Sequence, residues 1–174
     1  MTSIIRNIST AVLATTLCLG AAQAATDTAP SDAATIMVDE RPVPQLTQRD
    51  LDEQLWLNAL TGNVSALTQL VSMGANPRIA TSHGETALHA AAARGHIQIV
   101  SFLLRSGGVS VHSQTSNGWT PLHHAARFGH ATVANFLVRS GANPRLTTRD
   151  AGRKTPIDIA LDKGDLRMAR ILGW

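Results

Sequence analysis

Aromatic residues are scarce in this chain, which has three tryptophans, three phenylalanines and no tyrosine among its 174 residues. Hydrophobic residues still make up 44% of it, so a core must be built mainly from leucine, isoleucine, valine and alanine. Side chains of this kind suit closely packed helices better than a β-sandwich or a barrel. The length predicts a single domain.

Charge of one sign and the usual catalytic patterns are also lacking. The formal net charge is only +3, and no basic stretch is interleaved with aromatics, which argues against nucleic-acid binding. The glycines form no phosphate-binding loop, and no serine stands in a nucleophile-elbow pattern. The acidic residues are few and scattered, so no acid–base pair stands out. We therefore predict that the chain is not an enzyme and uses no cofactor.

Cysteine is almost absent, because Cys18 is the only one. It lies in an apolar stretch, residues 8–22, which follows the charge of Arg6 and ends at the small residues Ala22 and Ala24. These are the three regions of a secretory signal peptide, residues 1–24, and we predict cleavage after Ala24. The mature chain would then have no thiol with which to form a disulfide, attack a substrate or bind a metal.

Two kinds of membrane anchor are alternatives to cleavage. The apolar stretch is shorter than the roughly 20 residues that a spanning helix needs, and no later segment could span. A lipid anchor at Cys18 is disfavoured because Leu17 precedes it, where a small residue would be expected. We therefore expect export across the inner membrane, which in a Gram-negative bacterium leads to the periplasm.

Residues 25–46 are rich in alanine, threonine, aspartate, serine and proline and show no helical or strand period, which predicts a flexible acidic linker. Residues 25–53 hold seven acidic and two basic side chains, whereas the chain from residue 81 onward holds eleven basic and five acidic ones. The acidic leader could fold back and mask a basic groove. The alternative is a solvated tail beside a solvated face.

The rest of the chain, residues 47–174, repeats itself. Thr86, Thr120 and Thr155 occupy equivalent positions that lie 34 and 35 residues apart, and glycines recur with the same period. One-residue insertions are expected near residues 109–113 and 147–152. No single unit could bury its own apolar face, so we predict that four units stack around one core. The units are approximately residues 47–80, 81–114, 115–149 and 150–174.

The sequence of the third unit, residues 115–149, predicts two short helices and a protruding hairpin. Thr120 suits an N-cap, and Pro121 suits the first helical position. Gly129 breaks the helix, after which apolar residues recur every three to four positions and predict a second helix. Gly141 stands where a left-handed C-terminal cap belongs.

These motifs resemble the ankyrin repeat. The pattern T-P-L-H, then A-A-x-x-G-H, then G-A-N is most complete from Asn117 to Asn143, and the resemblance covers about Thr47 to Trp174. It implies an all-α solenoid of about four helix–turn–helix repeats with β-hairpin loops, in which the two degenerate outer units are caps. It also implies protein binding on a concave face made by the hairpin tips and first helices, with no particular partner.

Seven histidines raise the possibility of a metal site. His89 and His123 occupy the T-x-L-H position, where the family's imidazole bonds to nearby backbone, and His96 and His130 occupy the G-H position. The others have no partner one helical turn away, no H-E-x-x-H pattern and no cysteine neighbours. We predict no metal site, and the alternative is a metal-dependent hydrolase. The unassigned histidines are His83, His112 and His124.

The resemblance also assigns candidate protein-binding residues. Trp119 and Phe128, flanked by Arg94 and Arg127, would suit an acidic surface that carries apolar groups. The alternative is that both aromatic rings merely pack against the repeats. The residues before each repeat threonine or G-H pair are Glu85, Arg94, Trp119, Arg127, Phe128, Lys154 and Lys163, and the hairpin tips add His83, Asn117 and Arg153.

We therefore expect a monomeric adaptor or accessory protein that binds another exported or periplasmic protein and no nucleic acid. Two narrower hypotheses are an accessory factor for a periplasmic catalase or other oxidative-stress enzyme, and an immunity protein that blocks a periplasmic toxin. A structural spacer of the cell envelope is a third alternative.

Overall fold

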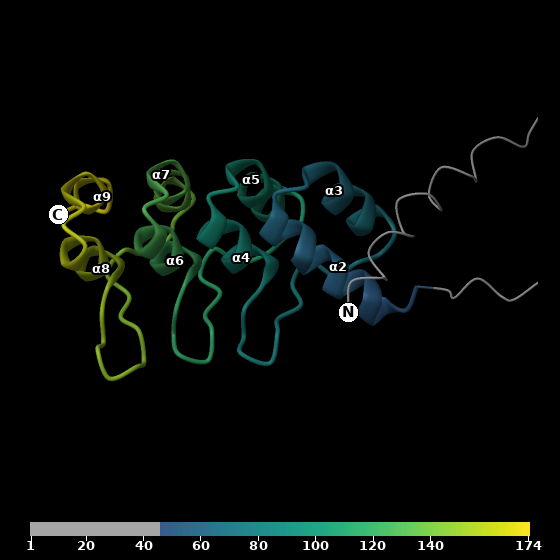
Figure 1. Ribbon diagram of the computed structural model, residues 1–174, viewed down its shortest axis with the longest axis horizontal. Coiled ribbons are helices and arrows are strands. Elements are labelled where there is room, and N and C mark those ends of the chain that lie inside the picture. The colour runs from purple at the N-terminus through teal and green to yellow at the C-terminus, as the bar shows by residue number, and fades with distance from the viewer. Residues whose placement is uncertain (1–45) are drawn as a thin grey trace, which may run out of the picture. The chain divides into compact units, whose positions relative to one another are not determined.

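The computed structural model describes residues 46–174, so the predicted signal peptide and nearly all of the predicted linker lie outside the described residues. Within this range the helices form four pairs, and Figure 1 shows the first helices of the pairs in one layer and the second helices in another. The first helices are α2 (Gln48–Thr61), α4 (Ala87–Arg94), α6 (Pro121–Phe128) and α8 (Pro156–Asp162). The second helices are α3 (Val64–Ser72), α5 (Ile97–Arg105), α7 (Ala131–Arg139) and α9 (Leu166–Ile171).

The prediction of an all-α stack of about four helix pairs is confirmed, and local chemistry sets the helix boundaries. Thr120 is the N-cap of α6 and Pro121 its first residue, as predicted. The helix ends at Gly129, whose φ of +76° is a left-handed conformation that glycine adopts without steric cost. Every first helix starts in the same way, with a threonine N-cap in a capping box. The four caps are Thr47, Thr86, Thr120 and Thr155.

One apolar cluster runs through all four pairs. Neighbouring first helices approach closely because small residues line their contact: Ala91 in α4 and Ala125 in α6 are fully buried. Larger side chains fill the space between the two layers, and Leu103 and Leu137 are fully buried there. Truncation of such a leucine to alanine typically costs about 2–5 kcal/mol of stability. The core is therefore shared between repeats rather than closed within any one of them.

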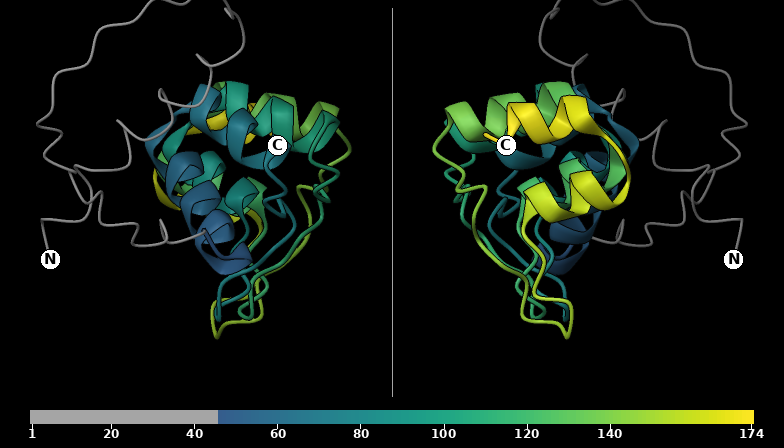
Figure 2. Two further views of the ribbon diagram at one scale, coloured as in Figure 1. Left: turned by 90° about the vertical axis from the view of Figure 1, so that its right-hand side faces the viewer. Right: turned by 90° about the vertical axis from the view of Figure 1, so that its left-hand side faces the viewer.

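The loops between pairs form hairpins that project away from the helices, as Figure 2 shows. Each hairpin is closed by a backbone hydrogen bond across its base, from Thr81 to Glu85 (2.9 Å), Thr115 to Trp119 (2.9 Å) and Thr148 to Lys154 (3.0 Å). Neighbouring hairpins are also joined: the Ser116 amide donates to the His83 carbonyl (2.9 Å) and the Arg149 amide to the Asn117 carbonyl (2.7 Å). Hairpin tips are therefore held in register with one another.

The structure relocates one of the expected insertions. Gly74, Gly108 and Gly141 all have positive φ and stand seven residues before a hairpin threonine, so the segments that follow them are of equal length. The extra residue of the second repeat therefore lies before Gly108, at Gly107, and not within residues 109–113. The last hairpin holds two extra residues and not the one expected, because Thr148 and Lys154 lie six apart where the other hairpin pairs lie four apart.

Candidate protein-binding surface

The histidine of the T-x-L-H motif holds the base of the next hairpin in place. The His123 Nδ1 accepts a hydrogen bond from the Thr120 amide (3.1 Å), and its Nε2 lies 3.2 Å from the Lys154 carbonyl oxygen. An amide N–H can only donate and a carbonyl can only accept, so this geometry requires a neutral ring with the proton on Nε2. His89 makes the same two bonds with the Thr86 amide (3.1 Å) and the Trp119 carbonyl (3.2 Å).

Burial keeps these rings neutral. It lowers the pKa of His89 to about 4, and it also lowers the pKa of His123. The pKa of His124 is lowered to about 4 as well, first by burial and then by the neighbouring rings of His89 and His123. The nitrogens of His89 and His123 are already bonded, so they are not free to bind a metal ion. Across residues 46–174, no three metal-binding side chains converge on one point.

Trp119 packs beside the rings of His123 and His124 and is half-buried rather than exposed. Its ring centroid is 5.8 Å from that of His123 and 5.4 Å from that of His124. The indole Nε1–H donates to an Asp150 carboxylate oxygen (3.2 Å), and the Thr148 hydroxyl donates to the other oxygen (2.6 Å). Donors on both oxygens hold the pKa of Asp150 below its usual value. The next hairpin thus fixes the orientation of the indole.

Arg127 joins Trp119 to Phe128. The guanidinium carbon lies 5.3 Å from the Trp119 ring centroid and 5.8 Å from that of Phe128, both within the range of a cation–π contact. Phe128 is 51% exposed at the end of α6, so one of the two rings faces solvent. Lys163 adds a cation close by, since its Nζ donates to the Arg127 carbonyl. We refer to Trp119, Arg127 and Phe128 as the aromatic–arginine cluster.

The repeat geometry agrees with a comparison against known families. A family model described as ankyrin repeats (3 copies) matches residues 55–148, which is more than half of the chain. This chain belongs to the ankyrin-repeat family. Ankyrin repeats are typically non-catalytic modules of protein–protein interaction, and the matching family is not an enzyme family.

One curated relative is the human protein "Ankyrin repeat domain-containing protein 39". It is 36% identical over 62 residues, which is 36% of this chain and 34% of the relative. The chain therefore spans about a third of the length of that curated ankyrin protein. Within the part of the chain that the structure describes, no helix is long and apolar enough to cross a membrane.

Three other predicted binding residues, Arg94, Lys154 and Glu85, form no hydrogen bond, ion pair or cation–π contact with the cluster. Arg94 is exposed at the end of α4, one repeat before Arg127, and forms no hydrogen bond or ion pair with the rest of residues 46–174. Lys154 is paired with Asp162 at 2.5 Å, so its charge is partly neutralised. Glu85 is half-buried at the base of the first hairpin.

The three predicted tip residues lie on different hairpins. His83 and Asn117 are exposed, but their carbonyls bond to the adjacent hairpin, so the tips cannot move independently. Arg153 is exposed in the last hairpin and has a φ of +42°, an uncommon left-handed conformation for a residue other than glycine. The structure therefore separates an ordered cluster around Arg127 from single residues distributed along the hairpins.

Sequence reasoning missed two residues of the site, Asp150 and His124. Asp150 reaches Trp119 from 31 residues away, through the hairpin that contains the two extra residues. His124 directly follows the motif histidine and was left without a role, although its Nε2 is buried with no hydrogen-bond partner among the described residues. Repeat periodicity carries no signal for either one, because neither occupies a position of the repeat motif.

Proposed function

We propose that this ankyrin domain is a non-catalytic adaptor or accessory protein that recognises another protein through the face made by its hairpins and first helices, with the aromatic–arginine cluster at the centre. The observation that carries this proposal is the position of Arg127 between the fixed Trp119 ring and the exposed Phe128 ring. Tryptophan and arginine are enriched among residues that dominate binding energy, and fixed side chains lose little entropy on binding.

The chemistry of the cluster suggests the kind of partner surface. An apolar side chain of the partner would cover Phe128, and a carboxylate beside it would accept hydrogen bonds from the Arg127 guanidinium. Lys163 and Arg94 would add long-range attraction for an acidic surface, which raises the association rate more than the affinity. We therefore expect binding that weakens as the salt concentration rises.

A pull-down with matched variants tests this assignment. Arg127→Gln combined with Phe128→Ala alters only exposed side chains, so the fold should persist. The control is Arg170→Gln, which removes one exposed positive charge from α9. We expect the double variant to reduce retention of the partner about tenfold or more and the control to leave it unchanged. Equal retention by both variants would refute the site while leaving the adaptor role open.

We also propose that the chain is exported to a bacterial periplasm, acts there as a monomer and binds another exported protein. The signal-peptide pattern of residues 1–24 supports this proposal. Mass spectrometry of protein from a periplasmic extract should find a mature chain that starts at Ala25. Full-length protein found only in the cytoplasm would contradict export.

The partner's behaviour separates the two narrower versions of this role. A toxin-immunity protein should abolish its partner's activity at equal molar amounts, because it covers the active site. An accessory factor for an enzyme such as a catalase should preserve or increase the enzyme's activity and prolong its lifetime at elevated temperature.

A further inference from the structure

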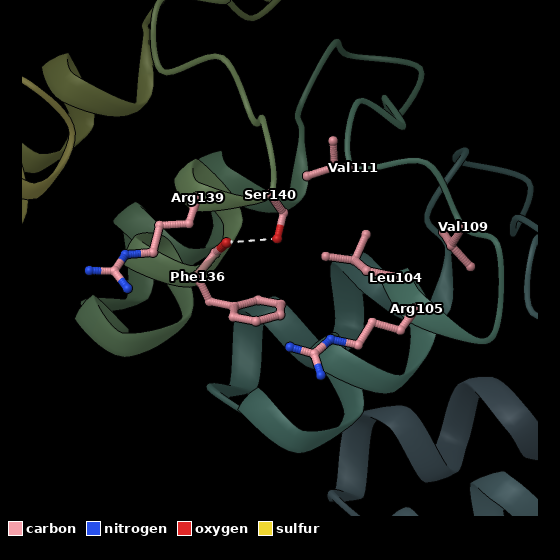
Figure 3. A pocket seen from close by; sticks show the side chains of 7 residues that line it. All are labelled: Leu104, Arg105, Val109, Val111, Phe136, Arg139 and Ser140. Atoms are coloured by element: carbon pink, nitrogen blue, oxygen red, sulfur yellow. Dashed lines mark hydrogen bonds between the residues drawn. The ribbon is translucent and has the colours of Figure 1, made fainter.

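A second surface feature lies in the layer of second helices, away from the aromatic–arginine cluster. A groove with a volume of about 590 Å³ opens where α5 and α7 end, next to the loop that follows α5. Figure 3 shows Phe136 near its centre, with Leu104 and Val111 beside it. Arg105 and Arg139 lie on either side of Phe136 in this view. The groove is of the size at which proteins hold a few side chains of a ligand.

The loop of the second repeat differs from that of the first where it passes the groove. In the first repeat, the Arg78 Nε donates to the Gly108 carbonyl (2.9 Å) and ties that loop across the next repeat. His112 occupies the equivalent position in the second repeat and, among residues 46–174, forms no bond to the third repeat. Val111 occupies the position that Pro77 has in the first repeat. Its apolar side chain forms one wall of the groove, at a junction that lacks the side-chain hydrogen bond made by Arg78.

The groove combines apolar surface with two positive charges. The Arg105 guanidinium carbon lies 5.9 Å from the centroid of the half-buried Phe136 ring, which limits its freedom. Arg139 is exposed, and neither arginine forms an ion pair with a carboxylate of the described residues. The C-terminal ends of α5 and α7 carry only about half a negative charge each, so within residues 46–174 the two arginines remain largely uncompensated. The Ser140 hydroxyl donates to the Phe136 carbonyl (2.9 Å), so it has no proton left to donate to a ligand.

We propose that this groove binds a segment of a partner protein in which apolar side chains are flanked by carboxylates. An apolar side chain over Phe136 would exclude water from the Arg105 guanidinium group, which lies beside that ring, while Arg139 adds positive charge at the edge of the groove. Desolvated guanidinium groups need an acceptor of opposite charge, and carboxylates offer bidentate hydrogen bonds to arginine. A purely apolar segment would leave the Arg105 charge partly buried and unpaired, so charge complementarity selects an acidic one.

A synthetic peptide probe tests whether the protein binds a segment of this chemistry, and variants of the groove then locate the binding. The probe is a fluorescein-labelled peptide with two leucines flanked on each side by aspartates, and its neutral counterpart has asparagines in their place. We expect full-length protein to bind the acidic probe in fluorescence anisotropy and to bind the neutral counterpart about tenfold more weakly. No binding of the acidic probe to wild-type protein would overturn the proposal.

Two double variants with the same change of charge locate the binding. Arg105→Glu with Arg139→Glu alters the groove and should weaken probe binding about tenfold or more. Arg49→Glu with Arg170→Glu alters exposed arginines outside both proposed surfaces and should leave probe binding within about twofold. Circular dichroism should show that both variants remain folded. Unchanged binding in the Arg105→Glu/Arg139→Glu variant would overturn the groove proposal and place the probe on another surface, such as the aromatic–arginine cluster.

A third variant examines the apolar wall without a change of charge. Val111→Ser should weaken probe binding about threefold to tenfold, because it removes apolar contact beside Phe136. Unchanged binding by this variant would contradict an apolar contribution. If instead the wild-type protein self-associates in sedimentation and the Arg105→Glu/Arg139→Glu variant does not, a second copy of the chain occupies the groove, and the proposed occupant is wrong.

Discussion

The two internal repeats and the two outer repeats cap their first helices with the same geometry but different chemistry. In the outer repeats the Thr47 and Thr155 amides donate to the carboxylates of Asp50 and Asp158, each at 2.9 Å. In the internal repeats an imidazole replaces the carboxylate, and its second nitrogen donates to the next hairpin. A carboxylate completes a local cap, whereas a histidine completes the cap and connects two repeats.

The start of the second helix shows the same contrast. Asn63 and Asp165 of the outer repeats accept hydrogen bonds from amides of their own helices. His96 and His130 of the internal repeats instead donate through Nε2 to the Leu60 and Ala93 carbonyls of the preceding repeat, at 3.2 and 3.0 Å. Each internal repeat is therefore bonded through histidine in both directions. We therefore expect the stability of the internal repeats to depend on bonds to neighbouring repeats, and that of the outer repeats to depend on their own local caps.

The largest expected effect is the loss of an internal histidine. His123→Ala should lower the free energy of unfolding by about 4 kcal/mol, because it leaves a cavity and two unpaired buried backbone groups. Asp158→Ala, its outer counterpart, should cost only about 1 kcal/mol, since it removes an exposed cap. Urea denaturation measures both values. Equal losses would show that the connection between repeats contributes no more than the local cap.

Glycines that end the first helices provide a second contrast. A Cβ at Gly95 would lie 2.6 Å from the His130 Nδ1, whereas a Cβ at Gly164 would meet nothing within 4 Å. Both residues have positive φ, +79° and +70°, so alanine is strained at either one. We expect Gly95→Ala to cost about 3 kcal/mol and Gly164→Ala about 1 kcal/mol, measured as thermal or urea unfolding. Similar costs would mean that the His130 ring moves aside freely.

As the pH falls, the internal repeats should lose stability before the outer repeats do. The pKa of His89 and of His124 is about 4 in the fold against an ordinary value of 6.5, so the unfolded chain binds more protons between these values. The free energy of unfolding should therefore fall as the pH decreases from 6.5 to 4, by about 2 kcal/mol at pH 5 for a single such histidine. The two rings lie 5.6 Å apart and titrate as a coupled pair, so their losses need not add.

Urea unfolding at pH 7, 6 and 5 checks this dependence. The control is His124→Phe, which keeps an aromatic ring and removes one titrating group, so its stability should depend less steeply on pH. The carboxylates of Asp50 and Asp158 have pKa values below the ordinary 3.8, so their contribution is lost only at still lower pH. An identical pH dependence in both proteins would contradict the role of His124.

The smallest expected effect concerns the ion pair of the last repeat. Lys154 and Asp162 lie 2.5 Å apart, but both side chains are more than half exposed. Asp162→Asn should therefore change the free energy of unfolding by less than about 0.5 kcal/mol, measured by urea unfolding at low and at high salt. A clearly larger loss would mean that surface charge supports the outer repeat in place of the histidine connections.

Sequence reasoning predicted the helix boundaries well because the signals that set them are local. Thr120, Pro121 and Gly129 act on backbone groups within four residues, so their roles follow from residue type and spacing. The binding role of the predicted site residues stays a prediction. The surroundings of Trp119 were predicted less well, because its indole is half-buried and bonded to Asp150, 31 residues away.

The sequence by itself determined the repeat, the helix pairs and the histidine positions, because a motif that recurs every 33 to 35 residues must place equivalent residues on equivalent faces. Only the tertiary structure decided how repeats differ at their junctions. The bond from Trp119 to Asp150 comes from a lengthened hairpin, and the groove at Phe136 lies beside a loop without the bond that Arg78 makes. Such contacts join residues some 30 positions apart, so their geometry follows from packing and not from the period.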